Sequence, residues 1–304
     1  MSITSYCSDT SALGMAFLKK DYSDIERNLA NNKILTNYLV EDGIKQCGYH
    51  IHINNPLTEI YGFTVFMVDF VLINFDNLHS NEQAVLVSKM LNKLYEEVYS
   101  NKGYYNFRIP SEYVDLNERF NMIFKNFFFC GGLNIYVSPG ILPKKAHSDS
   151  IKILKGDENY FKNKGDAFLE IAKESFSAYQ GQYHISPVMK DKAGDIYVEW
   201  LERGFNNSNE KVFVAEYNGE PAGFWTYNFD ELCQTTGLVA VTDRFRNKGI
   251  YFELVYSAVN EANSNKVFMT IGTQFNNLIV QRVWNKMGFL HFVNYYNIHL
   301  DNRG

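Results

Sequence analysis

The sequence predicts an α/β (α+β) fold with a mixed β-sheet flanked by helices, and three observations support this fold class. A β-branched run at residues 238–242 leads through a glycine-containing turn into a helical pattern. Two β-rich runs within residues 212–229 flank Asn218-Gly219, the strongest short signal for a β-hairpin. A second β-rich run at residues 267–272 also precedes a helical pattern. Strands that alternate with helices in this way are typical of α/β domains.

The segment before the hairpin supplies the remaining elements of such a domain. Residues 151–154 form a short strand candidate, and residues 167–176 form a helix candidate. The helix candidate places its apolar side chains on a shared side, at Phe168, Ile171, Ala172 and Phe176.

The turn after residues 238–242 is a candidate anion-binding site. It reads Arg-Phe-Arg-Asn-Lys-Gly from Arg244 to Gly249, and the following helix has apolar residues with a period near 3.6. The start of a helix collects free backbone N–H groups and the positive end of the dipole, which together bind phosphate. Arg244, Arg246 and Lys248 add positive charge that favours a pyrophosphate. The sequence has neither GxxxxGK[ST] nor GxGxxG, which argues against nucleotide hydrolysis and a dinucleotide redox cofactor.

Two motifs in this region resemble those of the GNAT acetyltransferase superfamily. The run from Arg246 to Tyr251 is similar to the [Q/R]xxGx[G/A] pyrophosphate loop, and the spacing of NxxAxxxYxxxGF is kept in a following set: Asn277, Val280, Trp284, Gly288 and Phe289. The resemblance implies a GNAT fold whose sheet is splayed at its centre between two parallel strands, residues 238–242 and 267–272. It implies acetyl-CoA as the co-substrate, held in that splay.

The resemblance also implies which residues hold the coenzyme. The pantetheine arm would pair with the backbone of Val239, Ala240 and Val241, and an N–H group there would polarise the thioester carbonyl. Asn277 would form a hydrogen bond with the coenzyme arm. The pyrophosphate would lie on the loop formed by Arg246, Asn247, Lys248, Gly249, Ile250 and Tyr251.

The chain departs from the motifs at positions that affect chemistry. Tyr251 replaces a small residue at the end of the loop, which tightens the approach to the pyrophosphate. Trp284 replaces the tyrosine that many members of the superfamily use to protonate the departing thiolate. Because an indole N–H cannot act as a proton source at neutral pH, we expect Trp284 to pack against the thioester as an aromatic wall. The acid is left open among four tyrosines: Tyr183, Tyr251, Tyr295 and Tyr296.

The N-terminal half is long enough for a domain of its own. Helix candidates at residues 82–99 and 115–126 and β-rich runs around them repeat the strand–helix–strand order of residues 267–300. No pyrophosphate-type loop occurs there. We therefore interpret residues 1–147 as a degenerate or partial GNAT-like domain and residues 148–304 as the catalytic GNAT domain.

The acceptor is suggested by a loop and helix between residues 177 and 205. Tyr183-His-Ile-Ser-Pro187 and Trp200, with the run GTQFNN at residues 272–277, resemble the dTDP-fucosamine N-acetyltransferase branch of the superfamily. This resemblance implies that the acceptor is the amine of a nucleotide-linked amino sugar. His184 is the candidate base because its ordinary pKa lies near neutrality. A structural role for His184 stays open, as do Asp230 and Glu231 as bases.

Two other functions stay open: an N-acyltransferase for a protein, peptide or other small amine, and a non-catalytic GNAT-like binding module. The net charge of −5 without a long basic run argues against a nucleic-acid partner. The most apolar run, residues 63–73, contains Asp69 and is too short to span a bilayer. The four cysteines have no metal-ligand spacing, so we expect no metal cofactor and a cytoplasmic protein with reduced thiols. A homodimer is left open.

Overall fold

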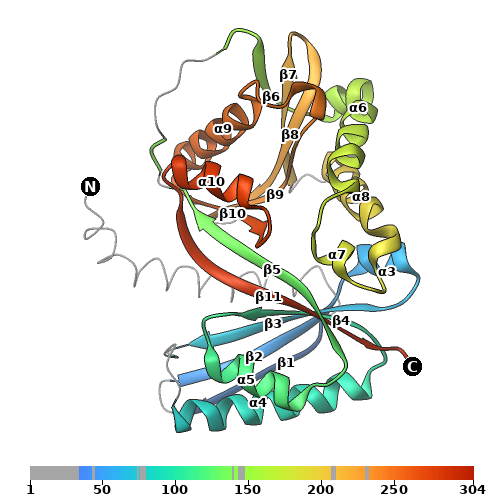
Figure 1. Cartoon of the computed structure of the whole chain (residues 1–304), viewed down its shortest axis with the longest axis vertical. Helices are drawn as coiled ribbons and strands as arrows, with labels where there is room; N and C mark the ends of the chain where they lie inside the picture. The colour runs from blue at the N-terminus through green and yellow to red at the C-terminus, as the bar shows by residue number, and fades with distance from the viewer. Residues whose placement is uncertain are drawn as a thin grey trace. The chain divides into compact units, whose positions relative to one another are not determined.

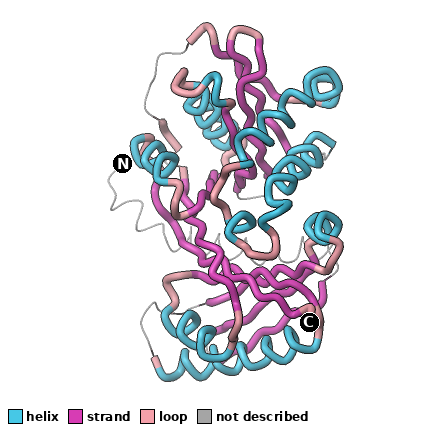
Figure 2. Tube along the Cα trace, turned by 45° about the vertical axis from the view of Figure 1, so that its right-hand side comes forward, coloured by secondary structure: helices cyan, strands magenta, loops and turns pink. Residues whose placement is uncertain are grey.

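A computed structural model describes residues 34–42, 45–73, 75, 80–138, 140–142, 148–206, 210–229 and 233–304 (Figure 1). The chain divides into two compact units, which are described separately. Unit 1 is Met1–Gly131 with Asn294–Gly304, and unit 2 is Gly132–Val293. In both units strands alternate with helices, so the predicted α/β class with a mixed sheet is confirmed (Figure 2).

Unit 1 is a sheet with helices packed on it. The strand order is β1-β2-β3-β4-β11; β3 and β4 are parallel and the other neighbours antiparallel. The strands are β1 (Ile34–Asp42), β2 (Lys45–Ile53), β3 (Val65–Ile73), β4 (Gly103–Pro110) and β11 (Leu290–Asn302). The helices are α3 (Asn55–Tyr61), α4 (Asn81–Ser100) and α5 (Val114–Ile123). The apolar run at residues 63–73, which is too short to span a bilayer, contains β3, and the two predicted helices correspond to α4 and α5.

The core of unit 1 forms where α4 and α5 cover the sheet. Helix α4 buries one apolar stripe that includes Leu86, Met90 and Leu94, and this stripe packs on side chains of β2, β3 and β4. Phe107 of β4 and Phe120 of α5 meet edge to face, with ring centroids 5.1 Å apart. The helices and the strands thus bury their apolar faces against one another, as the periodicity of each predicts.

The start of α4 is occupied by side chains of unit 1 itself. The Ser80 hydroxyl accepts a hydrogen bond from the Gln83 backbone N–H at 3.2 Å. The Asp115 carboxylate accepts one from the Ser80 backbone N–H at 3.4 Å. A helix start that is capped and faces a carboxylate is a poor site for an anion.

Unit 2 is also built on β-strands, with helices on both faces (Figure 1). Its strand order is β6-β7-β8-β9-β10-β5, in which β9 and β10 are parallel and the other neighbours antiparallel. The strands are β6 (Ile151–Lys155), β7 (Glu210–Tyr217), β8 (Glu220–Phe229), β9 (Cys233–Val241), β10 (Phe268–Gln274) and β5 (Phe127–Val137). The helices are α6 (Glu158–Ser177), α7 (Gln182–Ile185), α8 (Ala193–Asn206), α9 (Ile250–Ser264) and α10 (Leu278–Lys286).

Local signals in unit 2 explain its turns and helix ends. Asn218 and Gly219 both have positive φ, 50° and 85°, as the predicted two-residue hairpin turn between β7 and β8 requires. Helix α6 starts earlier than predicted because the Asp157 side chain caps it, accepting from the Tyr160 N–H at 2.8 Å. Helix α9 packs on one face of the sheet, and α6 and α8 pack against each other on the other.

Each unit is completed by a strand from the other half of the sequence. In unit 1, residues Tyr295 to Asn302 of β11 pair with β4. In unit 2, residues Leu133 to Val137 of β5 pair with β10. The compact units therefore do not divide at residues 147 and 148, where the sequence suggests a domain boundary. The order β3-α4-β4-α5-β5 repeats β9-α9-β10-α10-β11, which supports the interpretation of the N-terminal half as a degenerate copy.

Candidate active site

The sheet of unit 2 opens between β9 and β10. The two strands pair over three positions only, ending at Thr235 and Thr270. Beyond them β9 stays paired with β8, whereas β10 pairs with β5. The predicted central splay is thus present, and Val239, Ala240 and Val241 lie on the part of β9 that no longer pairs with β10. Their backbone edge toward the splay is available for hydrogen bonds to a ligand.

A bulge in β9 shapes the start of this free edge. The register between β8 and β9 shifts between Trp225 and Tyr227. The Thr226 hydroxyl accepts a hydrogen bond from the Leu238 N–H at 2.8 Å. A Cβ atom on Gly237 would lie 2.3 Å from that hydroxyl oxygen, so glycine is required there. Bulges of this kind turn backbone groups away from regular strand pairing.

The loop between β9 and α9 holds left-handed residues beside an uncapped helix start. Asn247 has a φ of 63° and Gly249 a φ of 90°. Gly249 is the N-cap residue of α9, and no side chain caps the helix. Consecutive N–H groups of such a turn and of the first helical turn point in one direction and form an anion site. The start of α9 therefore differs from that of α4, which is capped.

The basic side chains of this loop differ in their partners. The Arg244 guanidinium pairs with Glu220, with a second hydrogen bond at 3.2 Å. Arg246 pairs with Asp243 within the loop. Lys248 is exposed and forms no ion pair with any residue that the structure describes. The two arginines are thus partly neutralised by carboxylates, which the charge pattern of the sequence did not indicate.

Tyr251 and Trp284 meet in unit 2. The indole Nε1–H of Trp284 donates a hydrogen bond to the Tyr251 hydroxyl at 2.8 Å. Trp284 is 2% exposed, and its ring also meets Tyr136 edge to face at 5.3 Å. Burial raises the pKa of Tyr251 well above its ordinary value, although the hydrogen bond from Trp284 acts in the opposite direction. Tyr251 is therefore a neutral phenol at physiological pH.

A third aromatic side chain, Tyr179, joins this group from the segment after α6. Its hydroxyl forms hydrogen bonds with the side chains of Thr273 and Asn277 and with the Gln274 backbone, which lower its pKa, but burial outweighs them and raises it. Tyr179 also lies close enough to Tyr251 to raise the pKa of that phenol electrostatically. Tyr179 was not among the predicted site residues, although it lies in the same segment, residues 177–205, as Tyr183 and His184.

Asn277 is held in place before any ligand binds. Its side-chain amide donates to the Thr273 hydroxyl at 2.9 Å. The neighbouring Asn276 amide donates to the Gln180 carbonyl at 3.1 Å. The Asn276 bond ties the residues just after β10 to the segment that carries Tyr179. The structure thus brings together, beside the splay, residues from three parts of the sequence: Tyr179, Tyr251, Asn277 and Trp284.

His184 lies in an aromatic cluster next to this group. Its ring stacks on Tyr197 with centroids 5.9 Å apart, and Tyr197 also meets Tyr179 edge to face at 5.8 Å. Burial lowers the pKa of His184 despite a hydrogen bond to the Ser177 backbone that raises it. Its Nδ1 is buried and has no hydrogen-bond partner. The imidazole is therefore neutral near pH 7 and able to accept a proton. Asp230 and Glu231, the alternative bases, lie outside the described residues.

A buried carboxylate that was not among the predicted site residues lies beside the β9 bulge. Glu210 is 9% exposed, and its Oε1 has no hydrogen-bond partner. That oxygen lies 3.3 Å from the position that a Cβ on Gly237 would take. Burial raises the pKa of Glu210, although hydrogen bonds from Thr226 and Trp200 act against the increase. Glu210 is a second candidate proton acceptor.

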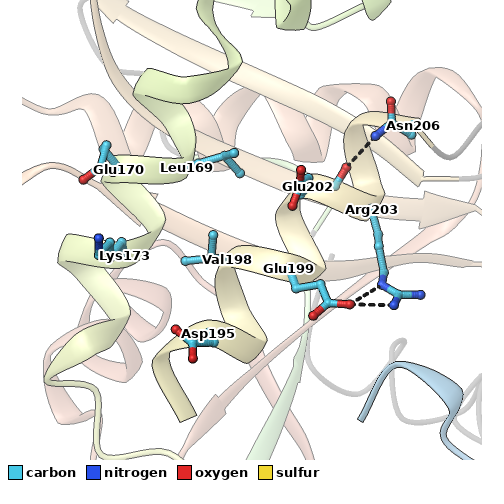
Figure 3. Close-up of a pocket in the computed structure, with 9 residues that line it drawn as sticks. All are labelled: Leu169, Glu170, Lys173, Asp195, Val198, Glu199, Glu202, Arg203 and Asn206. Atoms are coloured by element: carbon cyan, nitrogen blue, oxygen red, sulfur yellow. Dashed lines mark hydrogen bonds and ion pairs between the residues drawn. The ribbon is translucent and has the colours of Figure 1, made fainter. Parts of the chain in front are cut away.

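A groove of about 750 Å³ is lined by residues of α6 and α8 (Figure 3). Four carboxylates, Lys173 and Arg203 line it, and Arg203 pairs with Glu199. It contains none of the residues beside the splay.

The described residues hold no cluster of three or more His, Cys, Asp or Glu side chains that would suit a metal ion. Within the same residues, no helix has both the length and the apolar character needed to cross a bilayer.

Comparison with known proteins agrees with this geometry. Residues 167–289 match the acetyltransferase (GNAT) family. Over 139 residues the chain is 32% identical to the spore coat polysaccharide biosynthesis protein SpsD of Bacillus subtilis (strain 168). This match covers 44% of the chain and 47% of that protein, so the chain spans about half the length of its curated relative.

Solved structures share the fold over most of the chain. A GCN5-related N-acetyltransferase from Kribbella flavida matches with a TM-score of 0.54 and 9% identity, covering 93% of this chain and 94% of that one. A functionally unknown conserved protein from Staphylococcus epidermidis matches with a TM-score of 0.52 and 14% identity, covering 88% and 95%. At these identities the similarity shows the fold alone.

Proposed function

We propose that this chain, which carries a GNAT-family acetyltransferase domain over residues 167–289, is an acetyl-CoA-dependent N-acetyltransferase that acts on the amine of a nucleotide-linked amino sugar. One observation carries the cofactor assignment. The uncapped start of α9, with its left-handed Asn247 and Gly249, lies directly after the strand whose edge is freed by the splay. Pyrophosphate on the helix start and pantetheine along Val239–Val241 would use both features at once.

The acceptor class rests on the loop that contains Tyr183 and His184 and on the name of the relative. SpsD is named for the biosynthesis of a spore coat polysaccharide. An amino sugar carried on a nucleotide is the form in which sugars enter such polymers, and its amine is the nucleophile that acetyl transfer needs.

The chain itself performs the transfer through backbone groups and a small number of side chains. A neutral amine attacks the thioester carbonyl, which a β9 backbone N–H polarises as negative charge develops on the oxygen. A proton acceptor, His184 or Glu210, takes the proton released from the amine nitrogen, directly or through water. The carbon–sulfur bond then breaks, and the thiolate leaves with a proton.

We expect the purified chain to release free thiol from acetyl-CoA in the presence of a dTDP-linked amino sugar. Lysine peptides and peptides with a free N-terminus serve as competing acceptors in the same assay. Faster thiol release with a peptide than with any amino sugar would show that the acceptor is a peptide. The proposal that the chain is an acetyltransferase would then still stand. No thiol release with any amine, despite coenzyme A binding in calorimetry, would establish a non-catalytic binding module.

Replacing His184 with alanine tests its proposed role as base. We expect kcat to fall about 100-fold while the KM for acetyl-CoA changes little, because the loss affects the transition state and not cofactor binding. Because burial lowers the pKa of His184, the acid limb of kcat/KM should lie below pH 6.5 and disappear in the variant.

Glu210→Gln is the matched comparison, since it removes the other candidate proton acceptor without changing side-chain size. An unchanged kcat in His184→Ala together with a large loss in Glu210→Gln would transfer the role of base to Glu210. A raised KM for the acceptor with kcat nearly intact would leave His184 a structural part of the loop.

A further inference from the structure

We propose that Tyr251 is the acid that protonates the departing coenzyme A thiolate, and that Trp284 positions it. The inference rests on the proposed function. It joins two departures from the family motifs, a tyrosine at the end of the loop and a tryptophan in place of the usual tyrosine, into one arrangement.

The contact between the two side chains leaves the phenolic proton available. A phenol has one O–H donor and acceptor lone pairs on the same oxygen. The Tyr251 oxygen accepts the Trp284 N–H at 2.8 Å, so a lone pair and not the proton is used. Among the described residues, no acceptor for the Tyr251 proton is recorded. The Trp284 indole, which is not an acid at neutral pH, thus holds in place a phenol that can give up its proton.

The position of Tyr251 agrees with this role. It lies two residues after Gly249, in the first turn of α9, beside the loop that would bind the pyrophosphate. Its hydroxyl reaches Trp284 of α10, which follows β10, whereas α9 itself follows β9. Tyr251 therefore links α9, which follows the splayed strand β9, to α10, which follows the splayed strand β10. The coenzyme arm passes through this splay under the proposed function.

The other tyrosines are less suitable. Tyr295 and Tyr296 lie in unit 1, on the part of β11 that pairs with β4. Tyr183 is 8% exposed and meets Tyr197 edge to face in the aromatic cluster beside His184. Tyr179 is close to Tyr251, but three groups at the end of β10 already form hydrogen bonds with its hydroxyl.

The proton balance of the step is complete. The amine nitrogen forms a bond to the carbonyl carbon, the carbon–sulfur bond breaks, and the sulfur takes the proton from the Tyr251 hydroxyl. The Trp284 N–H stabilises the resulting tyrosinate by donating to its oxygen. The tyrosinate regains a proton from water, and the proton that the amine lost to the proton acceptor returns to water. The products are the amide and the free thiol, with no other reactant.

The test is Tyr251→Phe, which removes one oxygen atom and keeps the ring. We expect kcat to fall about 100-fold or more, with the Kd for coenzyme A within about threefold of the unaltered chain. Tyr256→Phe, which removes the same atom farther along α9, should retain full activity. Tyr179→Phe should lose less than Tyr251→Phe.

A rescue separates proton transfer from packing. Trp284→Tyr combined with Tyr251→Phe returns a phenol to the position where the family usually carries one. We expect the kcat of this double variant to be at least tenfold higher than that of Tyr251→Phe alone. The kcat of Trp284→Phe combined with Tyr251→Phe should be no higher than that of Tyr251→Phe alone. A purely structural role for Tyr251 would give no such recovery.

The outcomes distinguish this inference from the proposed function. If the unaltered chain transfers acetyl groups and Tyr251→Phe has a kcat within about twofold of it, Tyr251 is not the acid and the proposed function stands. If the unaltered chain releases no thiol with any amine, the proposed function itself fails. Loss of activity in Tyr251→Phe without rescue by Trp284→Tyr would also overturn the assignment.

Discussion

Replacing Gly249 with valine is expected to abolish coenzyme A binding. Gly249 has a φ of 90°, a conformation that a β-branched residue adopts only with strain of about 1–3 kcal/mol. Its Cβ would also occupy the space through which a pyrophosphate approaches the N–H groups at the start of α9. We expect the Kd in calorimetry to rise at least 100-fold.

Gly219 provides the matched control for that experiment. It has a φ of 85°, and a Cβ placed on it would meet nothing within 4 Å. Gly219→Val should therefore introduce similar backbone strain and lower the thermal stability by a similar amount, while leaving coenzyme A binding intact. If Gly249→Val binds coenzyme A as tightly as the unaltered chain does, the pyrophosphate site lies elsewhere.

Acidification is expected to destabilise unit 1 through His299. This side chain is 0% exposed, and its Nδ1 lies 3.1 Å from the Tyr104 hydroxyl. Burial lowers the pKa of His299 from 6.5 to about 3. The unfolded chain therefore binds more protons than the folded chain between these two values. The stability that His299 contributes is fully present above pH 6.5 and is lost as the pH falls from 6.5 toward 3.

The expected loss can be measured by urea denaturation. From the two pKa values, the free energy of unfolding should be about 2 kcal/mol lower at pH 5 than at pH 8 on account of His299. His299→Gln cannot titrate but keeps a hydrogen-bonding group near Tyr104. The difference between the unaltered chain and this variant isolates His299 from His50 and His52, whose pKa values burial also lowers. Equal pH dependence of the two proteins would show that His299 is not buried in its neutral form.

The parts of the fold that depend on neighbouring residues could be predicted from the sequence. Asn218-Gly219 encodes its turn locally, and the helix after Gly249 follows from its own apolar period. The antiparallel partners of β4 and β10 could not be predicted, because β11 and β5 lie far from them in the chain and nothing local indicates the pairing. No strands were expected at β1 and β2.

The candidate site shows the same division. The loop and the splayed strands were predicted because they form a continuous motif. Tyr251 and Trp284 were interpreted separately, as a tighter loop and a missing acid, because 33 positions separate them and only the structure shows their hydrogen bond. The ion pairs of Arg244 and Arg246 were likewise missed, since Glu220 is remote in sequence and the Asp243 carboxylate was not counted with the basic residues.

The pairing of β4 with β11 has a consequence for synthesis on the ribosome. Tyr295, the first residue of β11 that pairs with β4, is translated 185 positions after Pro110, the last residue of β4. At about 5–20 residues per second, the interval is on the order of ten seconds or more. During that time one edge of β4 has no native partner, and an unpaired edge invites pairing with other chains. Unit 1 thus completes its pairing only after this interval, and until then we expect nascent chains to need protection from aggregation at this edge.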